Sequence, residues 1–152
     1  MASPGLSLKG RALRYLAARE HSRFELQRKL EPFEETPGEL TQVLDLLEAK
    51  GFIDAQRVVE SVVHRRASRL GAARIRHELL SKGLEGETVQ LAVARLQSTE
   101  LERAREVWRK KFREPASDVA TRAKQMRFLA SRGFGAEAIR RVVAGADEAD
   151  EG

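Results

Sequence analysis

The stretch that decides the fold is Gly71–Leu84, GAARIRHELLSKGL, which has a counterpart fifty residues later in Thr121–Phe134, TRAKQMRFLASRGF. Both segments carry basic residues and a central apolar pair, and both close on a cation, a glycine and a large apolar residue. This ending is typical of a helix C-terminus, because glycine adopts the left-handed conformation and the cation faces the negative end of the helix dipole. A repeat of about 50 residues predicts an array of small helical units with an extended binding surface, and it argues against an enzyme pocket.

The composition allows one ordinary domain or about three units of roughly 45–50 residues. The chain of 152 residues is 41% hydrophobic and 34% charged, as expected for helices with one apolar stripe each. It has no cysteine, which excludes disulfides and thiolate metal sites. The N-terminal Met1–Gly5 lacks the apolar core of a signal peptide, and no apolar run approaches the roughly 18 residues of a membrane span. We therefore expect a soluble, cytoplasmic protein.

Positive charge concentrates in the last two-thirds of the chain. Residues 1–50 hold 8 cations and 8 anions, residues 51–98 hold 8 and 5, and residues 99–144 hold 12 and 6. Residues 145–152 hold 4 anions and no cation, so we expect an acidic, disordered tail. A basic face suits nucleic acid or an acidic protein groove. A merely solvated surface on arginine-rich helices would give the same charge.

Apolar residues recur at helical spacing along the chain and predict nine helices and no sheet. The β-branched run Val58–Val63 could be read as a strand, but its i, i+3, i+4 spacing favours a helix. The helices form three groups of three, at residues 8–53, 54–98 and 99–144. Because a unit of about 45 residues is marginal alone, we expect three tandem three-helix units stacked into an elongated, curved all-α array.

Four of the predicted helix starts carry capping signals. Ser22–Glu25 and Thr99–Glu102 match the capping box, in which two side chains satisfy exposed backbone N–H groups reciprocally. Thr36, followed by a proline and then a glutamate, is the expected N-cap of the third helix. Asp54 is the expected N-cap of the fourth.

The aromatic residues of the third unit could either pack in its core or be exposed on a binding face. Trp108, the single tryptophan, has the helical spacing of a core residue, which we favour over base stacking. Phe128 lies off the predicted inward face and either packs against a neighbouring unit or is exposed for binding. That inward face of the eighth helix is predicted to comprise Val119, Ala123, Met126 and Leu129.

No catalytic or metal-binding constellation is visible. The histidines His21, His64 and His77 lack a second ligand at metal spacing, and we expect them at the surface or at its boundary. The sequence has no glycine-rich phosphate loop, and its carboxylates pair with cations along helices, as in Glu106 with Lys110. We therefore expect no enzyme activity, no cofactor, no metal and no small-molecule substrate.

The cationic positions of the second and third units are the candidate binding residues. Arginine outnumbers lysine, and its planar fork suits phosphate or carboxylate groups. Dispersed solubilising charge is the alternative interpretation. The candidates are Arg65, Arg66, Arg69, Arg74, Arg76, Arg105, Arg109, Arg113, Lys124 and Arg127, of which Arg105, Arg109 and Arg113 form an i, i+4 stripe.

Four segments together resemble the RecX family, the bacterial regulatory proteins of the RecA recombinase. They are Ala12–Leu30 (ALRYLAAREHSRFELQRKL), Gly51–Asp54 (GFID), Gly71–Leu84 and Lys124–Phe134 (KQMRFLASRGF). They occur in order and at the right distances, and the likeness covers about residues 8–144. The chain departs from the family pattern after Asp54, where an aromatic residue followed by alanine is usual and this chain has Arg57 followed by two valines.

The resemblance implies three tandem three-helix units and a non-enzymatic protein that needs no cofactor. It also implies binding within the groove of the RecA–DNA filament, inhibition of the RecA ATPase, strand-exchange and co-protease activities, and promotion of disassembly. Recombination and DNA repair would be modulated in this way, and single- or double-stranded DNA could be touched directly. Two alternatives stay open: a basic helical module that binds free DNA, and a helical scaffold for another acidic partner.

Overall fold

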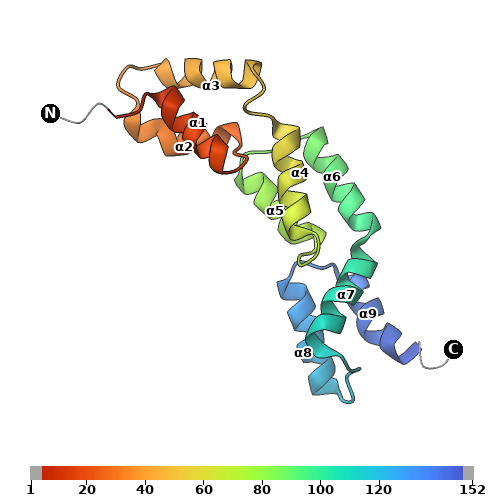
Figure 1. Cartoon of the computed structure of the whole chain (residues 1–152). Helices are drawn as coiled ribbons and strands as arrows, with labels where there is room; N and C mark the ends of the chain where they lie inside the picture. The colour runs from red at the N-terminus through yellow and green to blue at the C-terminus, as the bar shows by residue number, and fades with distance from the viewer. Residues whose placement is uncertain (1–4, 149–152) are drawn as a thin grey trace.

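The computed structural model describes residues 5–148, and within this range the chain forms nine α-helices, one 3₁₀ turn and no strand (Figure 1). The expected all-α class is thus confirmed. The elements are α1 Leu8–Ala18, α2 Arg23–Leu30, η1 Glu31–Phe33, α3 Glu39–Ala49, α4 Ala55–Arg66, α5 Ala72–Ser81, α6 Glu87–Ser98, α7 Glu100–Phe112, α8 Val119–Ser131 and α9 Ala136–Glu148.

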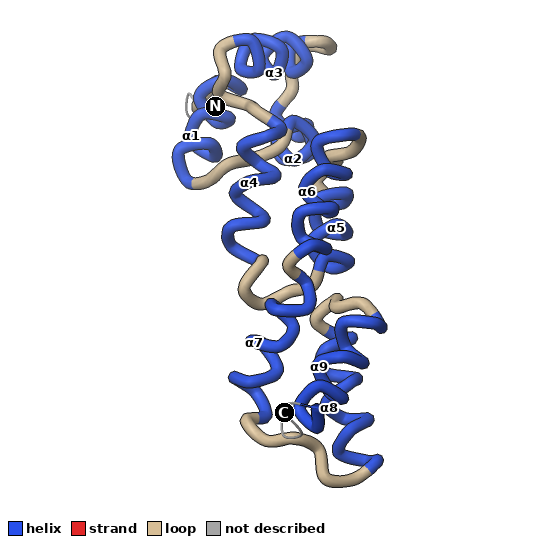
Figure 2. The backbone as a smooth tube through the Cα atoms, turned by 90° about the vertical axis from the view of Figure 1, so that its right-hand side faces the viewer, coloured by secondary structure: helices blue, strands red, loops and turns tan. Residues whose placement is uncertain are grey.

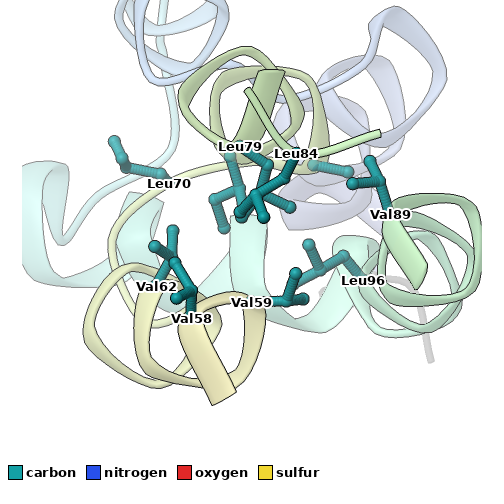
Figure 3. Close-up of a cluster of buried hydrophobic side chains, with 10 residues drawn as sticks. Val58, Val59, Val62, Leu70, Leu79, Leu84, Val89 and Leu96 are labelled. Carbon is teal, nitrogen blue, oxygen red and sulfur yellow. The ribbon is translucent and has the colours of Figure 1, made fainter. Parts of the chain in front are cut away.

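The helices group into three bundles, each with its own apolar core. Leu26 and Leu44 lie at the centre of α1–α3, and Leu129 lies at the centre of α7–α9. The middle core, between α4, α5 and α6, is shown in Figure 3. The three bundles follow one another along a long, bent molecule (Figures 1 and 2), which confirms the predicted elongated, curved array.

The valine-rich segment of the middle bundle is helical, as its spacing predicts. Val58, Val59 and Val62 are each at most 2% exposed and share the face of α4 that meets the other two helices of its bundle (Figure 3). Packing against these helices outweighs the modest helix-propensity cost of β-branched residues. Only Thr99 separates α6 from α7, so two nearly continuous helices carry the chain from the second bundle into the third.

Two of the four capping predictions are confirmed. The Ser22 hydroxyl accepts a hydrogen bond from the N–H of Glu25 at 3.1 Å, and the Glu25 carboxylate accepts one from the N–H of Ser22 at 3.0 Å. At the start of α4, Asp54 Oδ1 accepts a hydrogen bond from the N–H of Arg57 at 3.0 Å.

The two threonine caps are wrong. The C=O of Thr36 accepts from the N–H of Glu39 in a turn at 3.1 Å, and the residue before α3 is Gly38, which takes the left-handed φ of 88°. Thr99 ends α6 as well as preceding α7, so its hydroxyl donates backwards to the C=O of Leu96 at 3.3 Å. The Thr99 oxygen accepts from Arg103 Nε at 3.0 Å and from no backbone N–H of the first turn of α7, so the predicted capping box does not form.

The inward face of α8 also differs from the prediction. Val119 is 81% exposed and Met126 is exposed, whereas Gln125 is buried next to the predicted Leu129. The buried indole explains the shift, because Trp108 Nε1–H needs an acceptor and donates to Gln125 Oε1 at 2.9 Å. The core position of Trp108 is confirmed.

Two open features of the third unit are resolved. Phe128 packs within its own bundle, edge-on to Phe112 at 5.3 Å between ring centroids, so it neither bridges units nor forms a bare binding face. The backbone of α9 continues to Glu148, so the first part of the expected acidic tail is helical. The rest of that tail, residues 149–152, lies outside the described residues.

Candidate functional site

The second helices of the three bundles meet end to end. At the first joint, the C-terminus of α5 abuts the N-terminus of α2, where Ser22 Oγ–H donates to the C=O of Lys82 at 2.6 Å. Gly83 follows with a left-handed φ of 74°, and a Cβ at this position would lie 2.5 Å from the Cβ of Phe24. The close approach of the two units therefore requires glycine.

The second joint repeats this arrangement one unit further on. The C-terminus of α8 abuts the N-terminus of α5, where the N–H of Gly71 donates to the C=O of Arg132 at 2.8 Å. Arg74 Nη1 donates to the C=O of Ser131 at 2.7 Å. A Cβ on Gly71 would collide with the backbone C=O of Gly133. The repeated cation–glycine–apolar motif is therefore a docking element as well as a helix end.

A basic cleft of about 340 Å³ lies at this second joint. Its lining, taken from α4, α5, their connection and the end of α8, comprises Arg66, Arg69, Leu70, Arg74, His77, Glu78, Ser81 and Arg132. Arg66 Nε donates to Glu78 Oε1 at 3.1 Å. Among the residues that the structure describes, Arg69, Arg74 and Arg132 form no ion pair with a carboxylate within 4.0 Å. The cleft thus presents four guanidinium groups against one carboxylate.

The structure brings three of the predicted binding residues into this cleft, namely Arg66, Arg69 and Arg74. Sequence reasoning missed Arg132 and His77. Two signals could have found them: Arg132 is the cation of the repeated motif, and His77 lies one helical turn beyond Arg74.

The other predicted cations lie elsewhere. Arg65 is exposed on α4, and its Nε donates to the C=O of Ser61 in the preceding turn at 3.3 Å. Arg76 is exposed and lines a different cleft, between α5 and α6. The remaining candidates, all exposed in the third bundle, are Arg105, Arg109, Arg113, Lys124 and Arg127.

The predicted arginine stripe of the third bundle ends at Arg109. Arg113 follows α7 in the left-handed conformation, with a φ of 63°, and so does not continue the i, i+4 row. The predicted pairing of Glu106 with Lys110 is also wrong: Glu106 accepts from Arg109 Nη1 at 2.9 Å.

A partly buried pair from the start of α7, Glu100 and Arg103, holds the second joint together. Glu100 accepts hydrogen bonds from the N–H of Ala72 at 2.6 Å and from the N–H of Gly135 at 3.2 Å, so one carboxylate serves two bundles. Arg103 donates to the C=O of Leu70 at 2.6 Å and to the C=O groups of Ala67 and Leu96. Burial lowers the pKa of Arg103, and Glu100 opposes that effect. These bonds fix the frame on which the cleft is built.

One histidine departs from the expectation. His64 and His77 are exposed, as predicted, but His21 is 1% exposed, next to the first joint. Its Nδ1 lies 3.0 Å from the C=O of Arg19, and its Nε2 lies 2.9 Å from Lys29 Nζ. Because Lys29 can only donate, Nε2 accepts and Nδ1 carries the proton. Burial lowers the pKa of His21, and the positive charges of Arg19 and Lys29 lower it further.

Two negative findings concern the part of the chain that the structure covers. Residues 5–148 contain no group of three or more His, Cys, Asp or Glu side chains that could hold a metal ion. No helix within the same range is long and apolar enough to cross a membrane.

Comparisons with known proteins agree on one family. Residues 98–143 match the model of the RecX third three-helix domain, and residues 54–93 match that of the second. Regulatory protein RecX of Leptothrix cholodnii is 57% identical over 144 residues, which cover 95% of this chain and 92% of the relative. Regulatory protein RecX of Ralstonia pickettii is 50% identical over 143 residues, covering 94% of this chain and 90% of that protein.

The fold agrees as well. The crystal structure of RecX from Lactobacillus salivarius superposes with a TM-score of 0.77 at 18% identity, covering 93% of this chain and 95% of that one. At this identity the likeness concerns the fold alone, whereas the sequence matches extend over nearly the whole chain. The chain belongs to the RecX family of regulatory proteins.

Proposed function

We propose that this protein is a non-enzymatic, cytoplasmic regulator that binds the RecA–DNA filament and inhibits its ATPase, strand-exchange and co-protease activities. The observation that carries the proposal is the 57% identity to a regulatory protein RecX over nearly the whole chain. The three units, at residues 8–53, 54–98 and 99–144, would act as one bent surface. Its cations in the second and third units would face the filament.

The shape supports binding to a polymer. An elongated array of three small bundles presents one long surface, as helical repeat proteins do when they bind extended partners (Figure 2). The exposed arginines of α4, α5, α7 and α8 lie on successive units, so they could meet phosphates or carboxylates at several points of a filament.

The test is a titration of RecA ATPase on single-stranded DNA. We expect inhibition at substoichiometric to equimolar protein, accompanied by loss of strand exchange. Wild-type protein in excess that leaves both activities unchanged would overturn the proposal. Heat-denatured protein at the same concentration controls for non-specific effects of a basic polypeptide.

The second candidate is a module that binds free DNA, and the basic cleft at the second joint favours it. If free DNA were the main target through six or more phosphate contacts, its affinity should fall about 10³-fold or more between 50 and 200 mM salt. Tight binding to RecA-coated DNA with weak, shallow binding to naked DNA would support the filament instead.

A further inference from the structure

We infer that the cleft between the second and third bundles binds a phosphodiester group of a nucleic-acid strand through its backbone, without reading the bases. The cleft combines four guanidinium groups from α4, α5 and the end of α8 around one carboxylate. The inference deepens the proposed function, because it names a direct nucleic-acid contact within the surface that would meet the filament.

Most of the positive charge of the cleft is not neutralised by a carboxylate. Arg66 gives one N–H to Glu78 and Arg74 gives one to the C=O of Ser131, which orients both guanidinium groups and leaves further N–H donors on each. Arg69 is exposed on the rim and has no carboxylate partner among the described residues. Arginine donors held in this way match the oxygens of a phosphate bidentately.

Docking of the two units preorganises the cleft. Arg132 comes from the third bundle, and its C=O accepts the N–H of Gly71 at 2.8 Å. Arg74 spans the same joint through its bond to Ser131 at 2.7 Å. The Arg74 side chain and the backbone that carries Arg132 are therefore fixed before any ligand arrives, and the Arg132 guanidinium lies 5.1 Å from the centroid of the Phe128 ring. This order lowers the entropic cost of binding.

The lining favours a phosphate backbone over a protein side chain or a base. Leu70 is the only apolar residue among the eight that line the cleft, whereas protein interfaces use apolar and aromatic anchors at their centre. The lining also has no phenylalanine, tyrosine or tryptophan on which a base could stack. Contacts of this kind position a strand but carry no sequence information.

The experiment uses one loss variant and one gain variant, each with a matched control. Arg69→Gln removes a cleft cation that has no ion-pair partner among residues 5–144, and Arg14→Gln removes an exposed cation of α1 in the first bundle. Glu78→Gln removes the only carboxylate of the cleft and releases Arg66. Glu106→Gln removes a carboxylate that is also bound to an arginine, but on α7 and outside the cleft.

Binding is measured by fluorescence anisotropy on labelled oligothymidylate and oligoadenylate, without RecA, at several salt concentrations. Relative to Arg14→Gln, we expect Arg69→Gln to bind about tenfold more weakly at low salt, with a salt slope smaller by about 0.7. Glu78→Gln should bind the oligonucleotides more tightly than Glu106→Gln does. The ranking of the four variants by affinity should be the same on oligothymidylate and on oligoadenylate. Circular dichroism confirms that all four variants keep their helical content.

Three results would each overturn the inference. The first is an Arg69→Gln protein that binds DNA as tightly as Arg14→Gln does, and the second is a Glu78→Gln protein that binds no more tightly than Glu106→Gln. The third is an Arg69→Gln protein whose affinity for a labelled polyglutamate peptide falls as much as its affinity for DNA, which would assign the cleft to an acidic protein segment. Since RecA is absent, failure here is distinct from failure of the proposed function, which wild-type protein alone decides in the ATPase titration.

Discussion

At the residue scale, Glu25 carries more interactions than any other carboxylate of the first joint. It accepts from Arg19 Nη2 at 2.8 Å and from Lys82 Nζ at 3.3 Å, and it closes the capping box with Ser22. Burial raises the pKa of Glu25, but the hydrogen bonds from Arg19 and Ser22 and the charge of Lys82 outweigh it and lower the pKa to about 2. One side chain thus links the start of α2 to the end of α5.

We predict that Glu25→Gln lowers the free energy of unfolding by about 1–3 kcal/mol at neutral pH, because two cations and an N–H lose a charged acceptor. A carboxyl whose pKa is lowered on folding stabilises the protein above its unfolded value, near 4.5, and loses that contribution as pH falls toward 2. Urea unfolding should therefore show the difference in the free energy of unfolding from wild type narrowing between about pH 5 and pH 2. Glu106→Gln, at an exposed pair, should change stability little at any pH.

His21 should make the stability depend on pH closer to neutrality than Glu25 does. Burial lowers the pKa of His21 and the charges of Arg19 and Lys29 lower it further, while the hydrogen bond to the C=O of Arg19 and the charge of Glu25 oppose these effects. The native state then binds fewer protons than the unfolded state, so stability is complete above the unfolded pKa of 6.5 and is lost as pH falls below it. We expect the free energy of unfolding of the wild type to drop between about pH 7.5 and 5.5. His21→Gln should make the free energy of unfolding depend less on pH in this range. The control is His64→Gln, at an exposed position, which should keep the wild-type pH dependence.

Side-chain partners across the fold could not be predicted from the sequence. The apolar spacing of Trp108 places it in the core, but nothing local indicates that Gln125 is its acceptor. The spacing along α8 predicts Val119 and Met126 on the inward face, whereas both are exposed and Gln125 is buried. His21 is a similar case, because its burial depends on packing around Tyr15 and Lys29.

At the element scale, the repeated motif shows which structural features depend on local sequence and which depend on contacts between distant residues. A cation before a glycine predicts a helix end, and Gly83 and Gly133 do end their helices with left-handed φ values of 74° and 88°. The groups that these glycines approach, Phe24 and Arg74, lie far away in sequence. The helix end could therefore be predicted and the docking could not. The first bundle lacks this ending, because α2 runs directly into η1 with Pro32.

We predict that Gly133→Ala destabilises the joint between the second and third bundles. Its φ of 88° already disfavours alanine by about 1–2 kcal/mol, and the new Cβ would also lie 2.7 Å from the backbone N of Arg74. Gly51→Ala is the matched control, because Gly51 has a φ of 80° and no atom within 4 Å of the same position. Thermal unfolding should show Gly133→Ala about 1–3 kcal/mol less stable than Gly51→Ala. Equal losses of stability in the two variants would mean that the joint accommodates the new Cβ without an energetic cost.

At the scale of the whole molecule, the extended shape could be predicted because three-helix units of this size bury too little surface to stand alone. The direction of stacking could not, because it depends on Glu100 and Arg103, which resemble ordinary surface charges in the sequence. The structure shows them capping backbone groups of both neighbouring units. The same limit applies to the candidate site. The sequence indicates that arginines of the second and third units are candidates for binding, but it does not indicate which of them line the same cleft.

The shape should therefore depend on Arg103. This guanidinium satisfies the C=O groups of Ala67, Leu70 and Leu96, all in the second bundle, from its position on α7 in the third. Arg103→Met keeps much of the side-chain volume but takes the side-chain donor from the C=O groups of Ala67 and Leu70, at a cost of about 1–3 kcal/mol. We expect a looser second joint, seen as a broader distance distribution between spin labels on α4 and α8. Arg105→Met, on the exposed side of the same helix, should leave that distribution unchanged. A narrow, wild-type distribution in Arg103→Met would show that the glycine docking alone sets the bend of the array.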